Sequence, residues 1–224
     1  MNPLSSLPTT IAAIAIAASG FSLSTAHGQD WGYNEDGAGA ESSSRRLFKN
    51  KSIFAYDYLD LGYFNYDFDD AGVDSATGFG GELSLPITST LFAKASLSYA
   101  TPETSDGEDL DYLAWKLGGG IGIPLKSNLD LVIEGGLARE KFASGILDNP
   151  IDGHGLYVAP SLRLMLGDLF EIDGGVTITN IDNNTNFGLD LKALMHITPR
   201  LSAFGSAYYS NEVSQYGLGL RLSF

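Results

Sequence analysis

Few residues in this chain could carry out acid–base chemistry. Its three histidines are His27, His154 and His196, and Asp152 stands two residues before His154. An acid beside a histidine is a pairing used in general acid–base catalysis, but this spacing is not specific to it. No serine follows His154 at the two-residue spacing that would set both side chains on one face of a strand. We therefore expect His154 to be a rim residue and the chain not to be an enzyme.

Several other chemistries are excluded by composition. The chain has no cysteine, which rules out a lipoprotein anchor, a disulfide framework and thiolate metal sites. The glycines of Gly118–Gly120 are followed by no Lys-Ser/Thr pair, so they do not form a phosphate loop. A formal net charge of −14 argues against a nucleic-acid partner, because such partners attract basic surfaces.

From Ile53 onward, the chain is a series of segments in which apolar and polar residues alternate. This period of two predicts β-strands with one apolar face. We expect about ten of them, with eight as the alternative count. Their expected ranges are 53–67, 75–86, 90–101, 110–123, 128–142, 154–166, 169–180, 186–198, 200–210 and 214–224.

The connections between these segments are of two kinds. Tight turns are expected at 86–90, 124–128, 166–168 and 198–200, and mostly longer, polar connections at 69–74, 101–109, 143–153, 181–185 and 211–213. The two kinds alternate along the chain, as they do in membrane barrels with short periplasmic turns and longer external loops. An even number of strands would put both ends of the barrel on the periplasmic side.

The composition of the polar face indicates whether the apolar face points into the barrel or outward to lipid. In segment 90–101, Leu91 and Leu97 oppose Lys94 and Ser96, and in segment 128–142 the polar face carries Glu134 among glycine and alanine. A face in contact with water would be crowded with long charged side chains. Small residues with isolated charges are instead typical of a narrow polar lumen, so the apolar face should meet lipid. The predicted fold is an all-β, transmembrane, antiparallel up-and-down β-barrel, because residues after the first 28 contain no run of about 19 residues apolar enough for a membrane helix.

The isolated charges of the inner face should pair inside the lumen, since a charge held away from water needs a partner. They are Glu82, Lys94, Lys116, Glu134, Arg163, Glu171, Asp190, Lys192 and Arg221. A hairpin centred on Thr88 would place Glu82 directly opposite Lys94. These charges could also line a proton or ion path, but a barrel of this size has little room beyond its side chains.

The other pairs follow from the same construction. Glu134 should lie diagonal to Lys116, and Arg163 opposite or near Glu171. Asp190 and Lys192 are neighbours on one face of their segment, and Arg221 should face inward on the last one.

The first segment has an ambiguous pattern. Leu59, Leu61 and Tyr63 should face outward. Tyr56 and Tyr58 are also aromatic, yet they occupy the alternate positions, which face the other side of the strand. A β-bulge near Asp57 would reconcile the two sets. An aromatic girdle at the membrane interface is expected from Tyr63, Phe64, Tyr66, Phe68, Tyr99, Phe142, Phe187 and Tyr208.

The chain divides into three parts. Residues 1–28 contain no charged side chain and carry the apolar run Ile11–Ala18, which suits a signal peptide cleaved before Gln29. Residues 29–51 are rich in small and charged residues and should form a flexible periplasmic leader. Residues 52–224 form the predicted barrel.

The last segment of the chain is an alternating strand that ends at an aromatic residue. Tyr216, Leu218, Leu220, Leu222 and Phe224 fall at period two, and the chain ends at the aromatic residue. This ending resembles the C-terminal insertion signal of bacterial outer-membrane barrels, which the barrel-assembly machinery reads. Together with YLDLGY (58–63) and LGGGIGIP (117–124), it makes the chain similar to the small outer-membrane β-barrel domain proteins of Gram-negative bacteria, both porin-like and adhesin-like. The resemblance implies an outer-membrane location and no particular reaction.

The expected function is therefore that of a structural or surface-interaction protein with a packed polar lumen, in contact with outer-membrane lipid and lipopolysaccharide. A narrow passive pore is the first alternative. A hydrolase with a rim site near His154 is the second; omptin proteases also use a ten-stranded barrel, but their paired-aspartate motif has no counterpart in this sequence.

No cofactor is expected, apart from Ca²⁺ or Mg²⁺ at acidic external loops, which hold Asp69, Asp70, Asp74, Glu103, Asp106, Glu108 and Asp109.

Overall fold

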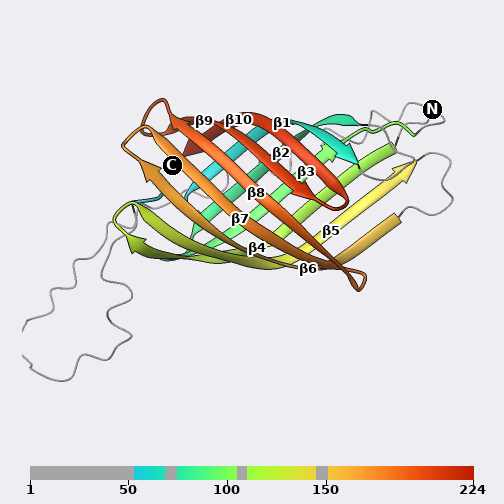
Figure 1. The fold of residues 1–224 in the computed structure, drawn as a ribbon, viewed down its shortest axis with the longest axis horizontal. Helices are drawn as coiled ribbons and strands as arrows, with labels where there is room; N and C mark the ends of the chain where they lie inside the picture. The colour runs from blue at the N-terminus through green and yellow to red at the C-terminus, as the bar shows by residue number, and fades with distance from the viewer. Residues whose placement is uncertain (1–52, 69–74, 105–109, 145–150) are drawn as a thin grey trace, which may run out of the picture. The chain divides into compact units, whose positions relative to one another are not determined.

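The protein folds into one closed, antiparallel barrel of ten strands (Figure 1). The computed structural model describes residues 53–68, 75–104, 110–144 and 151–224. The strands are β1 (Tyr58–Phe68), β2 (Ala76–Pro86), β3 (Leu91–Ala100), β4 (Leu110–Lys126), β5 (Leu129–Ser144), β6 (Ile151–Leu166), β7 (Phe170–Ile181), β8 (Asn184–His196), β9 (Leu201–Ser210) and β10 (Val213–Ser223). Each strand pairs with its neighbours in sequence, and β1 pairs with β10 to close the barrel. The prediction of a barrel of about ten strands is confirmed.

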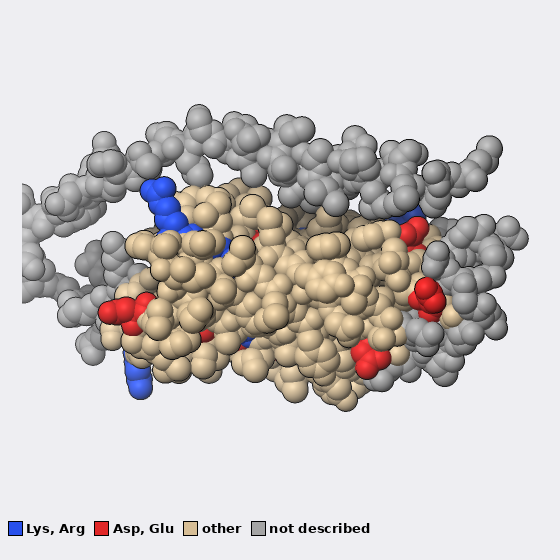
Figure 2. All heavy atoms as spheres, turned by 90° about the horizontal axis from the view of Figure 1, so that it is seen from above, with Lys and Arg blue, Asp and Glu red and all other residues tan. Residues whose placement is uncertain are grey.

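The two faces of each strand are as the alternation predicts. On β10, Leu218 is 74% exposed and Leu220 is 53% exposed, whereas Arg221 between Leu220 and Leu222 is buried. On β3, Leu91 faces out and Phe92 faces in. On the face that Figure 2 shows, the prominent charged side chains lie near the two ends of the barrel, and the surface between them consists mostly of other residue types. Even the shortest strands, β3 and β9, have 10 residues, which is enough for a tilted strand to cross a bilayer.

Among the described residues, there is no helix long and apolar enough to cross a membrane.

The two ends of the barrel differ, though less than the sequence predicts. At the end that we call the tight-turn end, short turns join β2 to β3, β4 to β5, β6 to β7 and β8 to β9. At the opposite end, the loop end, residues 69–75, 101–109 and 145–150 make longer connections. However, the β7–β8 connection is a two-residue turn in which Asp182 and Asn183 both have positive φ, of 49° and 67°, as a type I′ hairpin requires. The β9–β10 turn is equally short, so the connection predicted at 181–185 is too long, whereas the short one predicted at 211–213 differs by a single residue.

The β2–β3 hairpin is shifted by two residues from the predicted register. Lys94 lies opposite Ser84, and Glu82 lies opposite Ser96, so the hairpin is centred on Ser89 and not on Thr88. The turn itself gives the reason: the amides of Ile87 and Thr88 both donate to the carbonyl of Leu91, at 2.7 and 3.0 Å. A shift of two residues leaves every side chain on its original face.

Strand β1 needs no bulge. Its register with β2 and β10 is continuous from Tyr58 onward, and Tyr56, Tyr58 and Asp60 are all buried. The side chains of Tyr56 and Tyr58 therefore point into the lumen beside Asp60. The prediction of a bulge near Asp57 is wrong. The interior of the barrel, rather than a lipid interface, accommodates the two tyrosines.

For the same reason, only part of the predicted aromatic girdle faces outward. Tyr63 and Phe187 are exposed on the outer surface, together with Phe79, Tyr209 and Tyr216. In contrast, Tyr66 is buried inside the barrel, where Phe64, Phe68 and Phe142 pack around it and Tyr112.

Candidate functional site

The lumen is built in three layers between the tight-turn end and the loop end. An aromatic plug comes first, a chain of paired charges lies next to it, and an open cavity follows. The plug consists of Phe54, Tyr56, Phe92, Val132 and Met165. Each layer is formed by inward positions of several strands, so none of them is contained in one sequence motif.

The plug is held by the segment that precedes β1. The Tyr56 ring stacks on Phe92 with centroids 4.8 Å apart, and its hydroxyl donates to Asp130 Oδ2 at 2.9 Å. Ser84 Oγ donates to the Tyr56 carbonyl at 2.7 Å. Gly122 makes room for this ring, because a Cβ there would overlap with it. Tyr56 is thus fixed by stacking, by two hydrogen bonds and by the shape of the opposite wall.

Beside the plug, eight charged side chains form one continuous chain across the lumen, which we call the ion chain. Cations and carboxylates alternate along it in the order Arg163, Glu171, Arg221, Asp60, Lys192, Glu82, Lys94 and Glu134. The N···O distances between successive members lie between 2.6 and 3.7 Å. Its members come from β6, β7, β10, β1, β8, β2, β3 and β5. The formal charge of the chain is zero, as expected where charges are buried away from water.

The shortest contact of the ion chain joins the first and last strands. Arg221 donates to both carboxylate oxygens of Asp60, at 2.6 and 2.8 Å, and these residues lie directly opposite each other in the β1–β10 register. The guanidinium also lies 3.7 Å from the centroid of the Tyr58 ring. A bidentate, buried pair of this kind has strong directional preference, so it fixes how β1 and β10 meet.

The structure brings together most of the predicted lumen charges, with different partners in some cases. Lys94 contacts Glu82 at 3.1 Å despite the shifted register, because its long side chain reaches diagonally. Arg163 and Glu171 contact each other at 2.7 Å. Glu134, expected beside Lys116, contacts Lys94 instead at 2.9 Å.

Lys116 is not close to Glu134 because the β4–β5 register sets Lys116 opposite Ala138 and Glu134 opposite Gly120. Four positions along the strand are too many for a diagonal contact. Asp190 and Lys192 do share a face of β8, yet each binds elsewhere. Lys192 contacts Asp60 at 2.9 Å, and Thr177 donates to Asp190 at 2.5 Å.

The third layer is a cavity of about 510 Å³ that extends from the ion chain to the loop end. One wall is aromatic, with Phe64, Tyr66, Tyr112 and Phe142 from β1, β4 and β5. The other wall is polar, with Thr177, Thr179, Asn186 and Asp190 from β7 and β8. The packed lumen expected from the sequence thus holds for the tight-turn half, whereas the loop half is hollow.

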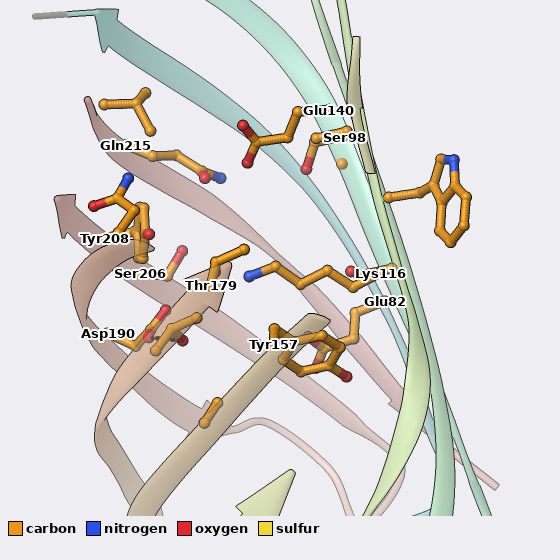
Figure 3. Close-up of a pocket in the computed structure, with 18 of the residues that line it drawn as sticks. Glu82, Ser98, Lys116, Glu140, Tyr157, Thr179, Asp190, Ser206, Tyr208 and Gln215 are labelled. Carbon is orange, nitrogen blue, oxygen red and sulfur yellow. Dashed lines mark hydrogen bonds between the residues drawn. The ribbon is translucent and has the colours of Figure 1, made fainter. Parts of the chain in front are cut away.

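Lys116 reaches into this cavity from β4. Figure 3 shows it between Glu140 and Gln215 on one side and Asp190 and Tyr157 on the other. Its Nζ lies 5.4 Å from the centroid of Tyr157 and 5.9 Å from that of Tyr208, and both contacts are within cation–π range. No carboxylate of the described residues lies within ion-pairing distance of it.

At the loop end, Glu212 closes the polar wall. Its two carboxylate oxygens accept from Asn184 Nδ2 at 3.1 Å and from Asn186 Nδ2 at 2.9 Å. These bonds join the β9–β10 turn to the start of β8. The short β7–β8 and β9–β10 turns thus position a carboxylate at the mouth of the cavity.

The predicted rim site lies on the outer face of the barrel. His154 is exposed, and its Nδ1 is 3.7 Å from Asp152 Oδ1. Arg139 holds the same carboxylate through two hydrogen bonds, at 2.7 and 2.5 Å. The Asp152 carboxylate is therefore engaged mainly by Arg139, and its position does not orient His154 as a catalytic base would need.

Of the acidic loop residues, Glu103 is described and exposed. Asp69, Asp70, Asp74, Asp106, Glu108 and Asp109 lie outside the described residues. Among the described residues, no three His, Asp or Glu side chains are grouped so that they could hold a metal ion.

Sequence reasoning missed several residues of the site. Asp60 is not among the lumen charges predicted from the sequence, although it binds both Arg221 and Lys192. Tyr56, Tyr58 and Asp60 are each two residues apart, so they share one face of an extended chain. This spacing could have indicated that the Tyr56 ring of the plug points into the lumen. Glu140 and Glu212 had no comparable signal, because their role depends on the walls that surround them.

A closed ten-stranded barrel with an apolar belt outside and paired charges inside is a small transmembrane β-barrel of the outer-membrane class. No protein-family model matches the sequence, and no curated protein matches it.

Solved structures of outer-membrane barrels resemble the chain. It is similar to the translocator domain of the autotransporter NalP from Neisseria meningitidis, with 14% identity and a TM-score of 0.46 over 81% of this chain and 92% of that chain. It is also similar to the attachment invasion locus protein Ail of Yersinia pestis, with 13% identity and a TM-score of 0.40 over 75% and 95% of the two chains. The KdgM porin has 8% identity and a TM-score of 0.37 over 74% and 99%. At such low identity, these likenesses do not bear on function.

Proposed function

We propose that this chain is an outer-membrane barrel that is closed toward the periplasm, opens a cavity toward the outside, and serves as a surface-interaction protein. In the usual orientation of such barrels, short turns face the periplasm and the loop end faces the exterior. Residues 1–28 act as the export signal, and residues 29–51 as a periplasmic leader. The outer ends of the strands contact lipopolysaccharide.

The observation that carries this proposal is the plug. Phe54 and Tyr56 are each 6% exposed, and the Arg163 guanidinium lies 4.8 Å and 5.1 Å from the centroids of their rings. Arg163 is itself bound to Glu171. The plug is therefore tied to the ion chain, and displacing it would leave a buried arginine without its aromatic contacts. That cost favours a closed lumen over a passive pore.

The narrow pore remains the competing function because half of the lumen is already hollow. Conductance in a planar bilayer separates the two. We expect the parent protein to give no steady channel current, and the double variant Phe54→Ala, Tyr56→Ala to give discrete current steps, because it removes two of the three aromatic rings of the plug.

Tyr208→Ala is the matched control, since it removes a ring from the cavity wall and leaves the plug intact. It should be as silent as the parent. Only protein that shows the heat-dependent gel shift of a folded barrel is used. A steady current in the parent, equal to that of the double variant, would establish the pore and reject the closed barrel.

A further inference from the structure

We propose that the cavity binds an organic cation that carries an ammonium group on an apolar stem. The proposal rests on the proposed function only in that the ligand enters from the outside, through the loop end. The charge balance of the cavity, the rings around Lys116 and a set of unpaired acceptor atoms support it independently of one another.

The first observation is a charge imbalance confined to the cavity. The ion chain beneath it is neutral, but among the described residues that line the cavity beyond that chain there are five carboxylates and a single lysine, Lys116. The carboxylates are Glu140, Asp173, Asp182, Asp190 and Glu212. Asp182 and Glu212 are exposed, whereas Glu140, Asp173 and Asp190 are half-buried in the walls, where their charge is screened less than it would be on an open surface. This excess attracts a cation from outside.

The second observation is that the rings of the cavity already hold an ammonium group. Lys116 Nζ lies over Tyr157 and Tyr208 without a carboxylate of the described residues at ion-pairing distance. The protein's own side chain thus occupies an aromatic position suited to a cation. A ligand ammonium would find similar ring faces, but it would be repelled by Lys116.

The third observation is that acceptor atoms in the cavity lack donors. Asn186 Oδ1 is buried and has no hydrogen-bond partner among the described residues. Glu140 makes no hydrogen bond or ion pair within the described part of the chain. Buried acceptors normally have partners, and an ammonium group, with three donors and no acceptor, would supply them.

The size of the cavity selects an organic cation over a bare ion. A volume of about 510 Å³ lies within the usual range of small-molecule sites. The aromatic wall of Phe64, Tyr112 and Phe142 offers apolar surface to a stem, while the acids and acceptors of the opposite wall meet the charged group. A ligand with both features fills both walls.

Calorimetry on the full chain, folded in detergent at low ionic strength, tests the proposal with three probes of similar length. They are 1,6-diaminohexane, the uncharged 1,6-hexanediol and the zwitterion 6-aminohexanoate. We expect the diamine to bind, the diol to give no heat, and the zwitterion to bind more weakly than the diamine. Glu140→Gln should weaken diamine binding about tenfold, as expected for one charged hydrogen bond. If that variant does not fold, Glu212→Gln replaces it with the same expectation.

The most discriminating variant is Lys116→Met, because the proposal predicts an increase in diamine affinity and not a loss. It frees the faces of Tyr157 and Tyr208 and removes the repulsion, so it should tighten diamine binding severalfold. Glu103→Gln, on an exposed residue outside the cavity, is the matched control and should change nothing.

Three results would each overturn the proposal: a binding heat for the diol equal to that for the diamine, weaker diamine binding in Glu103→Gln, or loss of diamine binding in Lys116→Met. Tighter binding of 6-aminohexanoate than of the diamine would also overturn it, in favour of a zwitterion held by Lys116. All of these outcomes are independent of bilayer conductance, which tests the closed barrel.

Discussion

At the scale of single residues, the lumen shows why buried charges must be considered as a set. Asp60 is 2% exposed and is bound by Arg221 and Lys192 from two different strands. Removing one partner of a buried pair leaves a charge that is far from water and incompletely compensated. Such losses are much larger than those at the surface.

Replacing Arg221 by methionine should therefore lower the free energy of unfolding by about 3 kcal/mol. The double variant Arg221→Met, Asp60→Asn should recover part of this loss, because it also removes the orphaned carboxylate. Urea titration of the barrel in lipid vesicles measures both values. Arg139→Met breaks the exposed pair with Asp152 and serves as the control, for which we expect a much smaller effect. Equal costs at Arg221 and Arg139 would mean that the ion chain contributes no more than a surface pair.

At the scale of one strand, alternate residues of β10 face two different environments, the lipid outside and the lumen inside. Its outward residues Leu218, Leu220 and Leu222 form part of the apolar belt, while Gly217 and Gly219 face the lumen. A Cβ at Gly217 would overlap with the Phe64 ring, so the inner face of the strand is already filled by an aromatic side chain of β1. Small residues inside and large apolar ones outside reverse the pattern of a soluble barrel.

The outward face of β10 can be tested with one substitution near the middle of the strand. Leu218→Arg should cost about 2–4 kcal/mol, because it places a cation in the hydrocarbon region. Leu218→Thr is the control and should be milder. Both are measured as folding titrations into phospholipid vesicles. Should arginine be tolerated as well as threonine, the belt would not lie in lipid.

At the scale of the whole molecule, closure depends on the last strand. The β1–β10 register is continuous from Tyr58–Ser223 to Phe68–Val213. Beyond it, the Phe224 amide donates to the Asp57 carbonyl at 3.2 Å, while its side chain stays 46% exposed. The ring of Phe224 therefore contributes little to the folded interior, and we expect its role to lie in recognition during assembly.

Deleting Phe224 should slow assembly of the barrel and leave unfolded protein in the periplasm, with synthesis unchanged. The ratio of folded to unfolded protein in unboiled gel samples, followed after a pulse of expression, measures this. A conservative Phe224→Trp variant should assemble normally, because an aromatic end is kept. Undiminished folded product after the deletion would show that the terminal aromatic is not read.

The alternation of residues was sufficient to predict the strands, their two faces and the inward charges, because the face of a residue in a strand is a local property. Leu91 and Phe92, or Leu220 and Arg221, are assigned to opposite sides by parity alone. The barrel class followed from the same pattern, since small residues with isolated charges do not make a water-facing surface. Most members of the ion chain could thus be named before their contacts were known.

The tertiary structure decided which of these charges meet. A shift of two residues keeps every side chain on its face, so alternation does not set the register, and the β2–β3 hairpin differs from its prediction by just such a shift. Contacts across the lumen, such as Lys192 with Asp60 over 132 residues of sequence, depend on closure of the whole barrel. The division of the lumen into plug, ion chain and cavity also arises only then, because it depends on how side chains from many strands fill one enclosed space.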